Sequence, residues 1–252
     1  MLPKLMSLYR KAGYEPLTGY NSYFFQNYLT APFTKLFKGG TATGDWGLAL
    51  QEVMFLEHFN HYLKPKTVLV VGNAQGWSTI ALSLIFPEAR VVGIDPAPEG
   101  NALTNEIAKA NGLKVTAVNG ASPGDVKAIV DQHLGAPLDF VLIDAMHLHD
   151  NVIADFAATQ ALASETTVTA FHDILIWSLV DAFNTLCGQW KMQGRVLTRT
   201  PSGMAVAWKS APAEFVDYLG AFCEDPNMYR SYRRVVLDTM IDKFNPAVNA
   251  LK

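Results

Sequence analysis

The sequence has few cysteines, no excess of basic residues and no long hydrophobic segment, and each shortage excludes a class of protein. Two cysteines among 252 residues, Cys187 and Cys223, are too few for a disulfide framework and lack the spacing of a metal site. A net charge of −3 provides no basic surface for a nucleic-acid backbone. No apolar run reaches membrane-spanning length, and the first residues lack a signal-peptide pattern. We therefore expect a cytoplasmic protein that binds neither nucleic acid nor membrane.

Half of the residues are hydrophobic, and from Thr67 onward short β-type runs alternate with helical patterns. This alternation predicts an α/β fold with a doubly wound, mostly parallel sheet and helices on both faces. The expected parallel strands are residues 67–71, 91–95, 114–118, 138–143 and 167–171. The expected helices are residues 77–86, 100–111, 123–134, 149–163 and 174–187. The turn Pro201-Ser202-Gly203 between the β-type runs 195–200 and 204–208 predicts a C-terminal antiparallel hairpin, which brings the sheet to seven strands.

The segments before and after this alternation differ in kind. Both lack the βα rhythm and carry clustered aromatic residues, and the apolar positions of residues 49–63 fall on one helical face. We expect a helical N-terminal cap or lid over 1–62, a ligand-binding core over 63–210 and a helical C-terminal extension over 211–252. The aromatic residues suit core and subunit contacts, as in a homodimer, or a lid over an apolar substrate.

The most informative segment is residues 67–95, in which an apolar run breaks at the turn 72–76 (GNAQG) and a second apolar run ends at Asp95. A glycine break lets the backbone approach a ligand, and the following helix offers unpaired N–H groups. An acidic residue about 20 positions later can accept hydrogen bonds from ribose hydroxyls. The glycines are four positions apart and Ser78 follows them, unlike the tighter turn that binds a pyrophosphate. The pattern favours S-adenosylmethionine over NAD, and an ordinary strand-to-helix turn is the alternative.

Polar residues follow every expected parallel strand, at the edge where ligands of open α/β sheets bind. In strand order the residues at these ends are the turn glycine Gly72, then Asp95, Ser122, Asp144 with His147, and finally His172 with Asp173. Because the carboxyl ends of parallel strands meet at one edge, these residues should converge on a single site.

The segments VVGNAQGWS, VVGIDP, NGAS, FVLIDAMH and AFHD, in this order, resemble the class I S-adenosylmethionine-dependent methyltransferases. Within that class the chain is most similar to small-molecule O-methyltransferases related to catechol O-methyltransferase and to the bacterial family with an Ile-Asp-Gly-Asp-His motif. The resemblance covers roughly residues 45 to 208 and implies a Rossmann-like methyltransferase fold that methylates a hydroxyl of a small-molecule acceptor.

The resemblance also implies which residues hold the cofactor. They are Gly72, Asn73, Ala74, Gly76, Ser78, Asp95, Pro96, Ala121, Ser122 and Asp144. The two glycines would line the methionine moiety, Ser78 would bind its carboxylate, and Asp95 would accept from the ribose. Ala121 and Ser122 stand where the family contacts adenine, although Ser122 also suits the N-cap of the helix expected at 123–134.

A divalent metal, Mg²⁺ or Mn²⁺, held by Asp144, His172 and Asp173, and a general base at His147 follow from the same resemblance. The metal would lower the pKa of the acceptor hydroxyl and fix its oxygen in line with the methyl group. His172 departs from the family pattern, since relatives place a carboxylate there, and imidazole suits Mn²⁺, Fe²⁺ or Zn²⁺ better than Mg²⁺. The alternative for His172 is a hydrogen-bonded histidine at a strand end.

Val70 is a second departure, because many methyltransferases have at this position an acidic residue that helps to hold the cofactor's amino group. Two other functions therefore stay open. One is an NAD-dependent oxidoreductase, which the spacing of the turn and the hairpin disfavour. The other is a non-catalytic protein that keeps the methyltransferase fold as a binding module.

Overall fold

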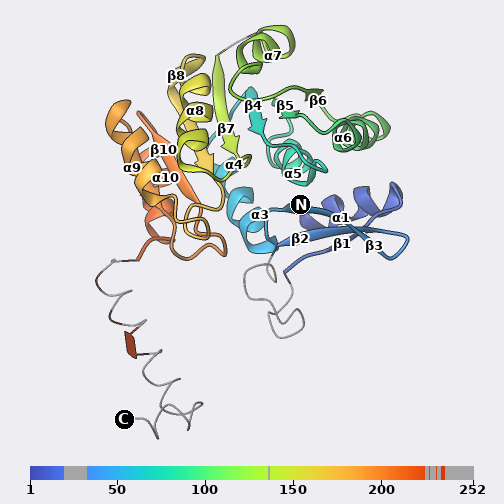
Figure 1. Ribbon diagram of the computed structural model, residues 1–252, viewed down its shortest axis with the longest axis horizontal. Coiled ribbons are helices and arrows are strands. Elements are labelled where there is room, and N and C mark those ends of the chain that lie inside the picture. The colour runs from blue at the N-terminus through green and yellow to red at the C-terminus, as the bar shows by residue number, and fades with distance from the viewer. Residues whose placement is uncertain (20–32, 136, 225–226, 228–230, 232–233, 236–252) are drawn as a thin grey trace, which may run out of the picture.

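A seven-stranded sheet forms the centre of the protein in the computed structural model, which describes residues 1–19, 33–135, 137–224, 227, 231 and 234–235 (Figure 1). The strand order is β6-β5-β4-β7-β8-β10-β9. These strands are β4 (Thr67–Val71), β5 (Arg90–Asp95), β6 (Val115–Asn119), β7 (Leu138–Ile143), β8 (Ala163–Phe171), β9 (Gln193–Val196) and β10 (Ala205–Trp208). The strands β4 to β8 run parallel, and β10 pairs antiparallel with both β8 and β9. The predicted sheet with its closing antiparallel hairpin is confirmed.

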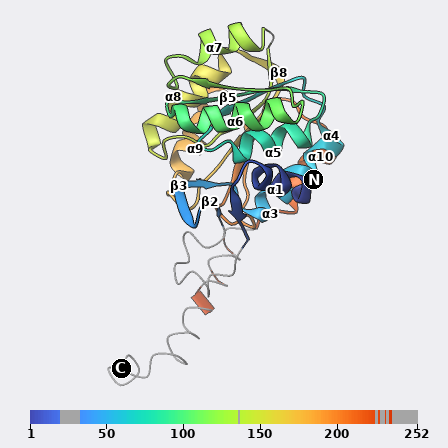
Figure 2. The ribbon, with the colours of Figure 1, turned by 90° about the vertical axis from the view of Figure 1, so that its right-hand side faces the viewer.

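Helices cover both faces of this sheet (Figures 1 and 2). One face packs against α1 (Leu2–Lys11), α3 (Leu50–Glu57), α4 (Phe59–Tyr62), α5 (Trp77–Ile85), α6 (Pro98–Ala110) and α10 (Ala213–Gly220). The other face packs against α7 (Val126–His133), α8 (His149–Gln160) and α9 (Val180–Gln189). Along β4, Val68 and Val70 enter the first core while Leu69 and Val71 enter the second. Burial on both faces explains why this strand is apolar without interruption.

The N-terminal segment is not all helical, so the prediction of a helical cap over 1–62 is wrong in part. Three strands, β1 (Glu15–Leu17), β2 (Thr34–Lys38) and β3 (Thr41–Gly47), form a small antiparallel sheet. Gly39 and Gly40 join β2 to β3 with φ angles of +57° and +82°, which glycine adopts without strain. Several aromatic residues on which that prediction depended lie outside the described residues: Tyr20, Tyr23, Phe24, Phe25 and Tyr28.

The C-terminal helix α10 joins the N-terminal segment through aromatic contacts. The Tyr218 ring stacks on Phe55 of α3 at 5.5 Å between centroids, and Phe215 meets Phe59 edge to face at 4.9 Å. These contacts support a core role for the aromatic residues concerned, and Tyr229 and Tyr232 lie outside the described residues. Among the described helices, none combines the length and apolar character needed to cross a membrane.

Candidate active site

A cavity of about 290 Å³ lies at the carboxyl ends of β4, β7 and β8. The β4–α5 turn contributes Gly72, Asn73, Ala74 and Ser78, and side chains of the N-terminal segment also line it. Asp144 and His147 reach it from the end of β7, and His172 and Asp173 reach it from the end of β8. The structure thus brings together most of the strand-end residues that the sequence singled out.

The two glycines of the β4–α5 turn are required by close packing between neighbouring turns. Gly72 has a φ of +94°, and a Cβ atom there would lie 1.9 Å from the backbone oxygen of Asp144. Gly76 has a φ of +79°, and its Cβ would lie 2.0 Å from Oγ1 of Thr104. Gly72 lines the cavity, whereas Gly76 serves the packing of α5 on α6.

Substituting Gly72 by alanine should therefore destabilise the protein more than an ordinary positive-φ substitution. We expect a loss of about 1–3 kcal/mol from backbone strain, with a further loss from the clash with Asp144. Gly112→Ala is the matched control, because Gly112 has a φ of +63° and no described neighbour within 4 Å of the added Cβ. Urea unfolding of both variants measures the difference, and equal losses would show that the close approach to Asp144 is relaxed at no cost.

Asn73 ties the turn to its neighbours rather than presenting a free side chain to the cavity. Its Nδ2 donates to Oδ1 of Asn101 at 2.9 Å, and its Oδ1 accepts from Thr79 at 2.7 Å. Asn101 in turn donates to Oδ1 of Asn119 at 2.7 Å. This buried network connects the turns that follow β4, β5 and β6, so the cradle is held in one shape before a ligand arrives.

The carboxylate of Asp95 closes the same cradle from β5. Its Oδ2 accepts from the N–H of Ala74 and its Oδ1 from the N–H of Ala97, both at 2.8 Å. The first bond holds Ala74 at a φ of +42°, a left-handed conformation. A carboxylate has about four acceptor positions, so two are left for ribose hydroxyls. Asp95 and the adjacent Pro96 lie outside the described lining of the cavity.

The predicted adenine contacts follow β6, also outside that lining. The expected N-cap role of Ser122 is wrong, because α7 begins only at Val126. Ser122 instead donates its hydroxyl to Oδ1 of Asp155 on α8 at 2.6 Å, and burial raises the pKa of that carboxyl. The N–H of Ala121 donates to Oδ2 of Asp125 at 2.8 Å, which holds the start of the loop.

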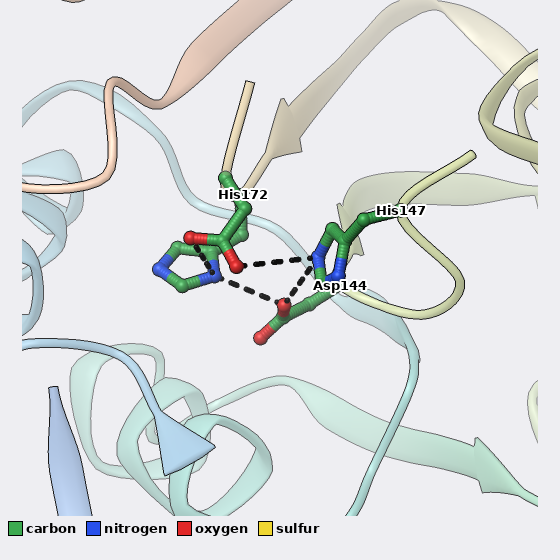
Figure 3. A group of neighbouring side chains, drawn as sticks. Asp144, His147 and His172 are labelled. Carbon is green, nitrogen blue, oxygen red and sulfur yellow. Dashed lines mark hydrogen bonds and ion pairs between the residues drawn. The ribbon is translucent and has the colours of Figure 1, made fainter. Parts of the chain in front are cut away.

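Four titratable side chains converge where β7 and β8 end. Asp144, His147, His172 and Asp173 can each direct one ligand atom into a space where all these atoms lie within 4.8 Å of one another. Nδ1 of His172 lies 3.0 Å from Oδ1 of Asp144 and 3.3 Å from Oδ1 of Asp173. Nε2 of His147 lies 3.5 Å from Oδ1 of Asp144 and 3.5 Å from Oδ2 of Asp173. Figure 3 shows the rings of His147 and His172 on opposite sides of the Asp144 carboxylate.

Glu52 of α3 is a fifth member of this group, and the sequence analysis missed it. Its side chain is fully buried, and Oε2 lies 2.9 Å from Nε2 of His172. The same carboxylate accepts the N–H of Ser202 at 2.9 Å and of Ala49 at 2.8 Å. The available signal was an acidic residue on the apolar face of the helix, next to Val53 and four positions before Leu56. A buried carboxylate of this kind requires a partner.

The pKa values in the cluster depend on burial and on the positions of the carboxylates around His172. Burial would lower the pKa of His172, but the Asp144 and Glu52 carboxylates outweigh burial and raise this pKa well above its ordinary value. Burial would raise the pKa of Asp144, but the charge of His172 outweighs it and lowers this pKa. The pKa of Asp173 is raised, because its burial exceeds the opposing effect of His172. His172 therefore joins two carboxylates, while Asp173 carries the least compensated charge.

The donor set fits a divalent cation. Oδ1 of Asp173 and Nε2 of His147 are buried and make no hydrogen bond to any described residue, although each lies within 3.5 Å of an oppositely charged or titratable neighbour, so both can turn to a cation. Two carboxylates and two imidazoles form a mixed oxygen and nitrogen set, which suits Mn²⁺, Fe²⁺ or Zn²⁺ better than Mg²⁺.

Comparisons with known proteins agree with this geometry. The family described as "Methyltransferase domain" matches residues 69–174, which include every predicted cofactor and metal residue. Among curated proteins, no sequence matches the chain.

Solved structures resemble the chain in fold. An O-methyltransferase from Streptomyces achromogenes, involved in tomaymycin synthesis and in complex with S-adenosylmethionine, is 15% identical with a TM-score of 0.55, over 64% of this chain and 81% of that one. A Bacillus cereus O-methyltransferase in complex with S-adenosylhomocysteine is 16% identical with a TM-score of 0.53, over 65% and 83%. A putative caffeoyl-CoA O-methyltransferase from Staphylococcus aureus is 15% identical with a TM-score of 0.54, over 65% and 85%. Residues 69–174 are therefore similar to a methyltransferase domain, and the chain shares the Rossmann-like fold of these solved structures.

Proposed function

We propose that this protein transfers a methyl group from S-adenosylmethionine to a hydroxyl group of a small molecule, with a divalent metal held by Asp144, His172 and Asp173. The observation that carries this proposal is that the donor cluster and the β4–α5 turn line one cavity. A metal bound there would lower the pKa of the acceptor hydroxyl and neutralise its developing charge. The matched family and the solved structures of similar fold support the reaction class.

The chain's own residues bind and orient the two reactants. The first turn of α5 offers backbone N–H groups beside Ser78, which is buried at the cavity and suited to the methionine carboxylate. Asp95 keeps two acceptor positions for the ribose. Val70 is fully buried in the core, so the cofactor's amino group must find its acceptors among other groups around the cavity. Transfer then depends on alignment of the acceptor oxygen, the methyl carbon and the sulfonium sulfur.

His147 is the proposed general base. Its ring stacks on Trp177, with centroids 5.8 Å apart and planes at 4°, and its side chain keeps 23% of its surface exposed at the cavity. Nε2 of His147 would accept the proton of the acceptor hydroxyl as the methyl group passes from the sulfonium sulfur to the acceptor oxygen, which would leave the cofactor as a neutral thioether.

Calorimetry with S-adenosylhomocysteine, with and without Mn²⁺, tests this proposal together with an assay of methyl transfer from labelled S-adenosylmethionine to a panel of hydroxyl compounds. We expect binding of S-adenosylhomocysteine, no binding of NAD, and methyl transfer that EDTA suppresses. Binding without transfer to any acceptor would favour the non-catalytic alternative. Binding of NAD without binding of S-adenosylhomocysteine would favour the alternative of an NAD-dependent oxidoreductase.

Asp95→Ala should weaken the binding of S-adenosylhomocysteine by roughly 1–3 kcal/mol, because ribose hydroxyls lose their acceptor. The same substitution frees the N–H groups of Ala74 and Ala97, so thermal melting has to be measured beside affinity. A lower melting temperature with unchanged affinity would show that Asp95 only ties the turn.

A cytoplasmic location and a homodimer stay predictions of the sequence.

A further inference from the structure

The two ring nitrogens of His172 face different surroundings. Nδ1 faces the cavity cluster, 3.0 Å from Asp144 and 3.3 Å from Asp173. Nε2 faces away from it, toward the fully buried carboxylate of Glu52 at 2.9 Å. The rings of His172 and Phe33 also meet edge to face, with centroids 5.7 Å apart. The imidazole is therefore fixed in orientation, and one particular nitrogen is directed at the proposed ligands.

Glu52 itself is held firmly enough to act as a fixed acceptor. Its Oε1 accepts the N–H of Ser202 from the loop before β10, and its Oε2 also accepts the N–H of Ala49 at the start of α3. The two N–H groups belong to segments that are far apart in sequence. Because both are backbone groups of the folded core, they hold the carboxylate in one position. An ionised carboxylate accepts hydrogen bonds and cannot donate one, so Nε2 of His172 must carry a proton to bond to it.

A neutral imidazole has one N–H and one lone pair, and the hydrogen bond at one nitrogen determines which tautomer forms. When a metal displaces the proton of Nδ1, the proton held at Nε2 by Glu52 leaves the lone pair on Nδ1, the nitrogen that faces Asp144 and Asp173. We propose that Glu52 is a positioning residue that fixes this tautomer and so makes His172 a ligand, giving the metal centre a preference for Mn²⁺ over Mg²⁺. This inference depends on the metal centre of the proposed function. Nitrogen ligation favours Mn²⁺ because Mg²⁺ binds almost entirely through oxygen.

The affinity of the full chain for Mn²⁺ and for Mg²⁺, measured separately by calorimetry, tests this role. Glu52→Leu removes the acceptor at similar size, and we expect its Mn²⁺ affinity to fall roughly 10–100-fold, the usual effect of losing such a partner. Its Mg²⁺ affinity should change far less. Glu52→Gln keeps a side-chain oxygen that can accept from Nε2, so it should recover most of the Mn²⁺ affinity.

The control is Thr34→Val, which removes a buried hydrogen bond to the backbone oxygen of Leu48 near the start of α3 but does not touch His172. If Glu52 is only structural, Glu52→Leu should lower the melting temperature as Thr34→Val does and leave the ratio of the Mn²⁺ and Mg²⁺ affinities unchanged. That result would overturn the inference. A wild-type protein that binds no Mn²⁺ would instead refute the metal centre on which the inference depends.

Should Glu52→Leu fail to fold, nitrogen NMR of the wild-type protein with labelled histidine decides the question. In the Zn²⁺-loaded protein, His172 is expected to show a protonated Nε2 and a metal-shifted Nδ1, with His172→Asn used for assignment. Metal ligation through Nε2, or no metal-shifted nitrogen on His172, would overturn the proposal.

Discussion

Removing the Asp173 carboxylate is expected to reduce kcat/KM by roughly 10²–10⁴-fold, because a metal acting as a Lewis acid supplies several kcal/mol to such a step. Asp173 carries a buried oxygen, Oδ1, that makes no hydrogen bond to any described residue and can therefore bind a metal without breaking one. Glycine is the better replacement, because Asp173 has a φ of +60° and an alanine there would add backbone strain. Methyl transfer and Mn²⁺ binding should fall together, while the affinity for S-adenosylhomocysteine stays nearly constant.

The control for this variant is Asp150→Ala, which removes an exposed carboxylate from the first turn of α8, outside the cluster. It should change neither rate nor metal affinity. EDTA should reduce the wild-type rate to that of Asp173→Gly, and added Mn²⁺ should restore only the wild type. Full turnover of exhaustively chelated wild-type protein would leave the metal-free reaction as the better account and make His172 a second candidate base.

The core and the convergence of the strand ends could be predicted from the sequence because they depend on local patterns. The apolar runs ending at Gly72, Asp95 and Ile143 need only parallel pairing to bring their next residues to one edge, and the sheet pairs them so. The N-terminal sheet had a local signal as well, since Gly39-Gly40 separates two β-type runs. The helical pattern of residues 49–63 was extended to the whole segment instead.

The contacts of Glu52 could not be predicted in the same way. Its hydrogen bonds join residues 120 and 150 positions apart, and no spacing rule relates α3 to the ends of β8 and β9. The role of Ser122 could not be predicted either. The local sequence suggests an N-cap, whereas the hydroxyl bonds to Asp155, 33 residues away. Long-range polar contacts of this kind are determined by how the layers pack, so a single sequence reveals the residue and not its partner.

His147→Ala is expected to lower kcat by roughly 10²–10⁴-fold while the affinity for S-adenosylhomocysteine stays nearly constant, because a general base touches the acceptor and not the nucleoside. His147 lines the cavity, and its Nε2 makes no hydrogen bond to the described residues, so this nitrogen is not tied to a fixed partner. Added imidazole should restore part of the lost rate, since the cavity left by the side chain can admit a free base.

His149→Ala is the matched control, because His149 lies two residues further along, is half exposed and bonds to Asp150. It should leave kcat unchanged.

The two alternative roles of His147 give different signatures. A fourth metal ligand would show a loss of Mn²⁺ affinity in His147→Ala together with the loss of rate, and imidazole would restore both. A histidine that only orders the loop after β7 would show a lower melting temperature and weaker cofactor binding together. A stable variant with normal affinities and the wild-type rate would remove His147 from the mechanism and move the search for the base to His172.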